Sequence, residues 1–342
     1  IKNYFFITMK NFVKSLLIPV LRKIGKIISF FVDLLLLLPI LFSGLILFFY
    51  RWVGSKRFPL NTLLLKKIGI FPIRDHYYEP LFNDKHLIKN KLKERNLPGI
   101  NFYLSKQLDL LEKLNFQKDF SNFIEKQKNK KEFRSFSISN GSYGPGDAEF
   151  LYNFLRHLKP SRVIEIGSGN STLIIKAALE QNKNHGYKSK HTCIEPYKNW
   201  LDSEKNIELV KRKLEETNID WSGELGKGDF LFIDSSHIIR PQGDVLYEYQ
   251  NIIPILNSGV VVHVHDIFSP RDYPESWITT DVRFWNEQYL LETLLSNSKR
   301  YEIIASINYL KHSHFEPLKK VCTFLDKKDE PGSFYFEILE EK

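Results

Sequence analysis

The alternation of apolar and polar positions changes along the chain. Residues 27–50 (IISFFVDLLLLLPILFSGLILFFY) are almost entirely apolar, and Asp33 is their single charge. After this run apolar residues mix with basic ones, and QLDLLEKL at 107–114 has the apolar spacing of an amphipathic helix. Farther on, short apolar runs alternate with helical patterns. We therefore divide the chain into three parts, 1–55, 56–135 and 136–342.

Seven short apolar runs in the third part have the composition of buried β-strands. They are 162–166, 191–195, 207–211, 229–234, 260–266, 301–308 and 333–339. Helical patterns lie between most of them, including 172–181 and 283–295. This alternation predicts an α/β fold with a doubly wound, Rossmann-like sheet of seven strands, in which the last two form an antiparallel pair. Ligands of such sheets bind beyond the carboxyl ends of the strands.

A Gly-rich loop leads into this α/β part of the chain. It reads NGSYGPGDAEF at 140–150, and we expect Asp147 to be the N-cap of the helix AEFLYNFLRHL that follows. Lys159-Pro160 should end that helix.

The apolar run at 27–50 is long enough to cross a bilayer, because a helix of this length spans roughly 36 Å. It is apolar on all sides, which disfavours a core helix, and no small-residue cleavage site follows, which disfavours a signal peptide. Lys and Arg flank both ends, whereas a simple span should show an asymmetry. Asp33 and Pro39 interrupt the apolar run near its middle. Two arrangements remain open, a straight span and a kinked, re-entrant insertion with both ends on the cytoplasmic side.

Charge separates the N-terminal parts from the rest. The net charge is +9, with +15 over residues 1–135 and −6 over 136–342. A basic excess beside an apolar run favours membrane lipids as partners, and we expect no nucleic-acid partner because no matching motif is present. The two cysteines, Cys193 and Cys322, suggest neither a disulfide framework nor a Cys-based metal site. Cys193, in the run HTCIE, is most simply a small buried apolar residue.

The first strand of the sheet carries an unexpected acid. In RVIEIGSGNST (162–172), Glu165 stands where a buried parallel strand normally has apolar residues, just before a Gly-Ser-Gly turn. A dinucleotide-binding turn requires a third glycine, and Thr172 stands there instead. A carboxylate in this pocket would repel a pyrophosphate but suits a cationic amine. S-adenosylmethionine has a cationic amino-acid end, a ribose and no phosphate, and Glu195, at the end of the next strand, is placed to accept hydrogen bonds from the ribose.

With these motifs in order, residues 136–342 resemble the class I S-adenosylmethionine-dependent methyltransferases. The matching stretches are VIEIGSGNST, CIEP, GDFLFIDSSH and GVVVHVHDIF. More narrowly, IDSSHIIRPQGDV, VHVHDIFSPRDYP and FWNEQYLL resemble bacterial methyltransferases of the family 24 type, which are often associated with surface-polysaccharide pathways. The resemblance implies cofactor contacts at Glu165, Gly167, Gly169 and Glu195. We also expect Ser168, Ser171 and Asp234 to contact the cofactor.

Two strand ends supply candidates for the chemical step. Asp234 and His237 follow the strand at 229–234, and His265 and Asp266 end the strand at 260–266. We predict His265, His237 and Asp266 as catalytic residues, with either histidine as general base because the ordinary pKa of imidazole is near 6.5. His263 lies deeper in its strand and is expected to be a core histidine.

A divalent metal is the alternative means of activating an acceptor hydroxyl. Catechol-type O-methyltransferases place acids at comparable strand ends, and Asp234, His265 and Asp266 occupy matching positions here. His265 departs from that pattern, because the family has an acid there. A nitrogen ligand shifts the preference from Mg²⁺ towards a transition metal.

These features together predict a membrane-attached methyltransferase whose catalytic domain faces the cytoplasm. The expected acceptor is an oxygen of a surface-glycan precursor or of a lipid-linked saccharide. One alternative is an NAD-dependent sugar-modifying enzyme, which Glu165 and Thr172 disfavour. The other is an inactive membrane-tethered scaffold, which the retained His/Asp pairs disfavour. Arg240, Arg271, Asp272, Tyr273, Trp277 and Trp285 would border the acceptor site.

Overall fold

The chain forms two compact units, residues 1–86 and 87–342. The computed structural model describes residues 18–76, 78–81, 93–128, 135–197, 200–204 and 206–340. The boundary between the units falls inside residues 56–135, the second of the three predicted parts. Its first part belongs with the N-terminal helices, and its later part packs with the α/β domain.

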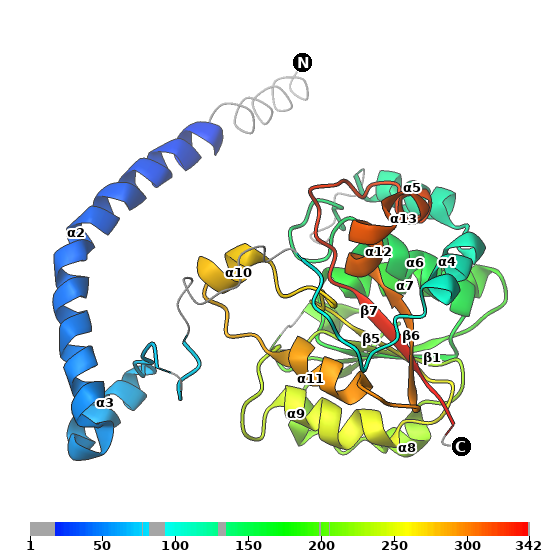
Figure 1. The fold of residues 1–342 in the computed structure, drawn as a ribbon. Helices are drawn as coiled ribbons and strands as arrows, with labels where there is room; N and C mark the ends of the chain where they lie inside the picture. Colours follow the sequence, from blue (N-terminus) through cyan, green and yellow to red (C-terminus); the bar gives the residue numbers. More distant parts are fainter. Residues whose placement is uncertain are drawn as a thin grey trace. The chain divides into compact units, whose positions relative to one another are not determined.

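The first unit is built around one long helix, α2 (Ile18–Val53), which runs through Pro39 without a turn. Figure 1 shows that this helix is bent along its length, and an interior proline favours such a bend. Within Arg22–Val53 the most apolar stretch has a mean hydropathy of 2.5, and none of that stretch is buried. By length and composition, α2 can cross a membrane.

A short helical corner follows α2. It consists of η2 (Ser55–Arg57) and α3 (Pro59–Ile68). The hydroxyls of Tyr50 and Thr62 hydrogen-bond to each other across this corner, and that of Thr62 also donates to the carbonyl of Ser55 at 2.9 Å. These contacts fix α3 to the end of α2.

The second unit contains a mixed seven-stranded sheet. Its strands are β1 (Arg162–Ile166), β2 (Lys190–Ile194), β3 (Glu208–Val210), β4 (Phe230–Ile233), β5 (Val261–Val264), β6 (Tyr301–Ser306) and β7 (Phe334–Ile338). The spatial order is β3-β2-β1-β4-β5-β7-β6. Strands β1 to β5 are parallel, and β7 runs antiparallel to β5 and β6. The predicted fold class, including the antiparallel last pair, is confirmed.

Helices cover both faces of this sheet (Figure 1). One face carries α4 (Leu104–Lys113), α5 (Gln117–Lys128), α6 (Asp147–Leu158), α7 (Asn170–Asn184), α12 (Ile307–Ser313) and α13 (Phe315–Val321). The other face carries α8 (Trp221–Glu224), α9 (Asp244–Tyr247) and α11 (Glu287–Leu295). Successive strand residues alternate between the two cores: Phe232 of β4 packs with the first set and Ile233 with the second.

The remaining elements are short. They are the 3₁₀ helices η4 (Trp200–Ser203), η5 (Leu214–Glu216) and η7 (Ile253–Ile255), the π-helix η6 (Glu248–Ile252) and the helix α10 (Glu275–Thr279). Helix α11 begins at Glu287, later than the pattern at 283–295 predicts. Trp285 and the residues before it form a loop instead.

The predicted N-cap of α6 is wrong. Gly146, with φ 88°, is the cap residue, and Glu149 accepts a hydrogen bond from its amide at 3.2 Å. Asp147 is the first helical residue, and its carboxylate accepts hydrogen bonds from the amides of Gly332 and Ser333 just before β7. An acid is favourable at the N-cap and at several positions of the first helical turn. Composition alone therefore does not show which of these positions Asp147 occupies.

Candidate active site

A cleft opens at the carboxyl ends of β1, β2 and β4. Gly167, Ser168, Glu195 and Asp234 are among its lining residues. The position is the one at which a doubly wound sheet binds its ligand, because the strand order reverses beside β1. Four of the seven predicted cofactor residues therefore face this cleft.

Gly167 brings the turn after β1 close to the end of β4. Its φ is +87°, and a Cβ atom at this position would lie 2.3 Å from the carbonyl oxygen of Asp234. Its amide donates to the carbonyl of Ile194 at the end of β2. A residue with a side chain would therefore be strained in its backbone and would clash.

Glu195 is held in the cleft by its neighbours. One carboxylate oxygen accepts from the Ser168 hydroxyl at 3.0 Å, and the other accepts from the amide of Tyr197 at 2.9 Å. The acid is thus positioned at the cleft wall directly after β2, where the sequence predicted a ribose contact.

Glu165 lies elsewhere than expected. Its side chain is fully buried and does not line the cleft. One carboxylate oxygen accepts from the hydroxyls of Ser171 and Thr172, at 2.7 and 3.0 Å, beneath the start of α7. These contacts support the start of α7, and the contact of Glu165 with the amino end of the cofactor stays a prediction. Ser171 takes part in the same contact, and Gly169 is the N-cap of α7, so neither lines the cleft.

The four residues predicted from the strand ends do come together. His237 Nε2 lies 3.3 Å from Asp234 and 3.5 Å from Asp266, while His265 Nδ1 lies 3.6 Å from each of these carboxylates. The Asp234 side chain is 34% exposed, whereas those of His237 and His265 are about 5% exposed. Asp234 is therefore the member of the cluster that a ligand in the cleft meets first.

Two further acids complete the cluster, and the sequence analysis missed both. Glu287 of α11 lies 2.8 Å from His237 Nδ1, and Tyr249 donates to its other oxygen. Asp147 of α6 lies 3.6 Å from His265 Nε2. Each approaches from a helix far from the strand ends in sequence, and no local motif marks it.

The charges of the cluster shift its pKa values strongly. Burial opposes ionisation of Asp234, but His265 and His237 outweigh burial and hold its pKa well below the usual range. Burial also disfavours a charged His237, yet hydrogen bonds to Asp234 and Glu287 raise its pKa to about 10. The pKa of His265 is likewise raised, because Asp266 and Asp234 outweigh burial. Neither imidazole has the near-neutral pKa expected of an unperturbed general base.

The backbone at the cluster is unusual as well. His237 and Asp266 have φ values of 61° and 57°, in the left-handed region that residues with side chains seldom adopt. Such strain is typical of functional sites. The predicted core position of His263 agrees with the structure, since it is fully buried, donates to or accepts from the Ser333 hydroxyl at 3.1 Å and stacks on Phe232.

Residues 164–267, which contain the turn after β1, Asp234 and Asp266, match a family model described as a methyltransferase domain. The chain therefore contains a methyltransferase domain, as its resemblance to the class I S-adenosylmethionine-dependent enzymes implied. The seven-stranded sheet with antiparallel β7 is the fold that the resemblance implied. The match disfavours the nicotinamide-dependent alternative.

Several other proteins are similar to this methyltransferase. A protein of Archaeoglobus fulgidus, described as uncharacterized, is 27% identical over 169 residues, covering 46% of this chain and 74% of its own length. The O-methyltransferase TomG from Streptomyces achromogenes, solved with SAM, is 12% identical, with 67% of this chain and 89% of that chain covered and a TM-score of 0.36. The O-methyltransferase from Bacillus cereus, solved with SAH, is also 12% identical, with 68% and 90% covered and a TM-score of 0.33.

The cluster of this methyltransferase fits a divalent metal ion. Ligand atoms of Asp234, His237 and Asp266 lie within 4.8 Å of one another, and His265 Nδ1 is equally near both carboxylates. The structure therefore adds His237 as a second nitrogen donor to the predicted set of Asp234, His265 and Asp266. Two carboxylates and two imidazoles suit a transition metal.

Aromatic side chains border the cluster. The Trp285 ring packs against His237 with centroids 4.4 Å apart, and Trp277 packs edge-on against Trp285. The guanidinium of Arg283 lies over both tryptophans, at 4.2 and 4.6 Å from their ring centroids. Trp277 and Trp285 were predicted to border the acceptor site, whereas Arg283 was not.

Proposed function

We propose that this methyltransferase is attached to a membrane and methylates an oxygen atom of a saccharide-type acceptor presented there. The observation that carries the proposal is the half-buried Asp234–His237–His265–Asp266 cluster beside an aromatic wall, in a chain whose first unit contains an exposed apolar helix.

Methyl transfer requires an acceptor oxygen, a sulfonium and a group that takes the proton. The oxygen attacks the methyl carbon, the carbon–sulfur bond breaks and S-adenosylhomocysteine leaves, while the proton of the acceptor passes to a carboxylate oxygen of Asp234 and from there to water. A carboxylate of low pKa suffices, because the acceptor oxygen becomes strongly acidic as it gains the methyl group. Asp234 is the exposed group of the cluster and is ionised, so we assign it the contact with the acceptor hydroxyl. His237 and His265 then act as positioning residues that keep this carboxylate charged and oriented. A divalent ion bound by Asp234, Asp266 and an imidazole would lower the pKa of the acceptor hydroxyl and so ease the loss of its proton.

The aromatic wall suits the proposed acceptor. Sugar rings present apolar C–H faces together with hydroxyl groups, and binding sites of small polar molecules combine aromatic side chains with a few polar groups. Trp285 and Trp277 offer aromatic faces, and Arg283 offers hydrogen-bond donors beside them.

Helix α2 supports the membrane attachment. Its apolar side chains are exposed, Arg51 lies in its last turn, and the η2 residues Lys56 and Arg57 follow it. Such residues suit anionic headgroups at the cytoplasmic face. A continuous helix favours a crossing over a hairpin, because a hairpin needs a turn and α2 has none between residues 27 and 50.

The test uses the full chain in membranes. Membranes containing it are incubated with methyl-labelled S-adenosylmethionine and a membrane lipid extract, and we expect label in the lipid-linked saccharide fraction as acid-stable O-methyl sugars. Membranes with Asp234→Asn are the control. Label that appears only in water-soluble products, or on nitrogen, would contradict the acceptor class. Failure of the protein to float with liposomes would contradict the attachment.

A further inference from the structure

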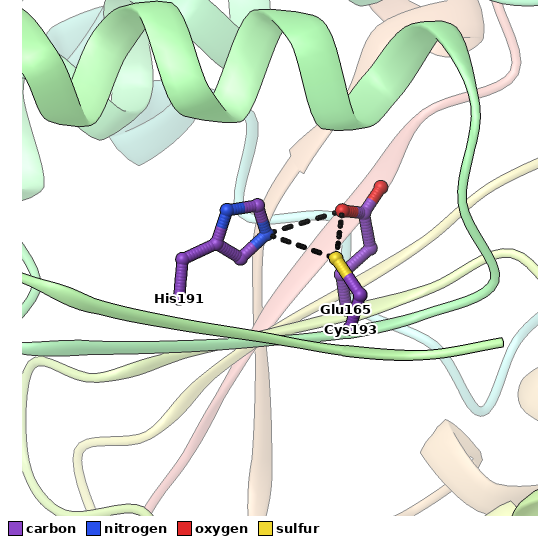
Figure 2. Close-up of side chains that lie close together, drawn as sticks. All are labelled: Glu165, His191 and Cys193. Atoms are coloured by element: carbon purple, nitrogen blue, oxygen red, sulfur yellow. Dashed lines mark hydrogen bonds and ion pairs between the residues drawn. The ribbon is translucent and has the colours of Figure 1, made fainter. Parts of the chain in front are cut away.

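A second group of metal-binding atoms lies away from the cleft, between the sheet and α7. Figure 2 shows Glu165 of β1 together with His191 and Cys193 of β2. His191 Nε2 lies 3.1 Å from Glu165 Oε2, Cys193 Sγ lies 3.2 Å from the same oxygen, and the sulfur and nitrogen are 3.5 Å apart. All three residues are buried. Each therefore directs one donor atom to a common point.

These separations match the edges of a zinc coordination tetrahedron. Zinc binds sulfur at about 2.3 Å and nitrogen or oxygen at about 2.0–2.2 Å, which places neighbouring ligand atoms roughly 3.2–3.6 Å apart. An ion about 1 Å out of the plane of the three atoms would lie at bonding distance from each. The site requires no movement of its ligands larger than a few tenths of an ångström.

We propose that Glu165, His191 and Cys193 bind a zinc-class divalent ion, with the fourth position left to water or a small ligand. The carboxylate and a thiolate together neutralise the two positive charges, so the buried site has no net charge. The thiol proton of Cys193 is released to solvent when the metal binds. A sulfur donor selects zinc-class ions over Mg²⁺. The cysteine count suggested no such site, because two of the three ligands are not cysteines.

The surroundings of the site fit this role. The Ser171 and Thr172 hydroxyls hold the other Glu165 oxygen, which leaves Oε2 facing the histidine and the thiol, as the outer contacts of metal ligands do. His191 Nδ1 has no partner among the described residues and points away from the cluster in Figure 2. His191 also lines a surface hollow, so the ring lies between this hollow and the buried Glu165 and Cys193. Three lysines, Lys176, Lys183 and Lys188, line the same hollow.

The test is a Co²⁺ titration of the chelator-treated full chain in detergent, followed to equilibrium under reducing conditions. Cobalt bound to a thiolate gives a sulfur-to-metal charge-transfer absorption, and the chain has two cysteines. We expect this absorption to saturate near one equivalent and to disappear on addition of Zn²⁺. It should be lost in Cys193→Ala and retained in Cys322→Ala, the matched control at the other buried cysteine. It should also be retained in Asp234→Asn, because the active-site cluster has no sulfur donor.

His191→Gln keeps the thiol and provides a second variant should Cys193→Ala fail to fold. We expect it to weaken Co²⁺ binding at least tenfold. A folded wild-type chain without the absorption would overturn the proposal. So would an absorption that survives Cys193→Ala, or an unchanged affinity in His191→Gln.

Discussion

His237 Nδ1 lies 2.8 Å from a carboxylate oxygen of Glu287, although the two residues are 50 positions apart. The contact joins the loop after β4 to the first turn of α11. Glu287 is fully buried, and its other oxygen accepts from the Tyr249 hydroxyl. It therefore fixes both the orientation and the charge of the imidazole, whose other nitrogen faces Asp234 and Asp266.

Glu287→Gln should lower the pKa of His237 from its value of about 10, because the hydrogen bond to a charged partner is lost. We expect methyl transfer to fall by about 10- to 100-fold, as for other outer partners of functional histidines. NMR titration of the imidazole and the membrane labelling assay measure the two effects. Glu292→Gln is the control, since Glu292 lies on α11 but pairs with Arg95. An unchanged pKa of His237 would contradict the assignment.

Asp234→Asn should abolish methyl transfer by at least about 100-fold, because the amide takes no proton from the acceptor. Glu215→Gln, which changes another carboxylate of the cleft, should have little effect. The labelling assay compares both variants with His265→Ala. Full loss in His265→Ala together with retained activity in Asp234→Asn would restore the histidine base that the sequence suggested.

The strand ends explain how far the sequence could predict this site. Asp234 and Asp266 follow apolar runs in adjacent parallel strands, so their proximity follows from topology alone. Glu287 and Asp147 reach the cluster from helices, and only the tertiary packing of α11 and α6 brings them there. The hydrogen bonds of Glu165 with Ser171 and Thr172 could not be predicted from the sequence, because they depend on how strand alternation directs its side chain towards α7. Sequence position showed that the acid is unusual but not which face it occupies.

Glu195→Ala should weaken S-adenosylmethionine binding by about 1–3 kcal/mol, because a ribose contact at the cleft wall is lost and Ser168 loses its acceptor. Calorimetric titration gives the affinity directly. Glu208→Ala on the neighbouring strand β3 is the control for removing an acid from this edge of the sheet. Equal affinities for Glu195→Ala and the wild type would mean that the ribose binds elsewhere.

Gly167→Ala should reduce the free energy of unfolding by more than Gly186→Ala. Both glycines have positive φ values, +87° and +91°, so each substitution carries a similar backbone cost of about 1 kcal/mol. A Cβ atom at Gly186 meets no atom within 4 Å, whereas at Gly167 it would lie 2.3 Å from the Asp234 carbonyl oxygen. We expect the clash to add about 1–3 kcal/mol. Urea unfolding of both variants gives the contribution of the clash as the difference between their losses of free energy of unfolding. Equal losses in the two variants would show that the turn after β1 can move away from β4.

Glu330 should make the stability of the domain depend on acid pH. Its carboxylate contacts Lys311, His312 and Asn308 of α12, at 2.6, 2.8 and 3.0 Å, close to the segment that carries Gly332 past Asp266. Burial opposes ionisation, but these hydrogen bonds outweigh it and lower the pKa of Glu330 to about 2.

A carboxyl group whose pKa is lowered on folding stabilises the protein above its unfolded pKa, here about 4.5, and loses that contribution as the pH falls towards 2. Because the side chain is 37% exposed, we expect only about 1–2 kcal/mol. Urea unfolding between pH 6 and pH 3 should therefore show a shallower loss of stability in Glu330→Gln than in the wild type. The exposed Glu316, also next to α12, gives the control variant Glu316→Gln. Parallel pH profiles for all three proteins would mean that the Glu330 contacts do not persist in solution.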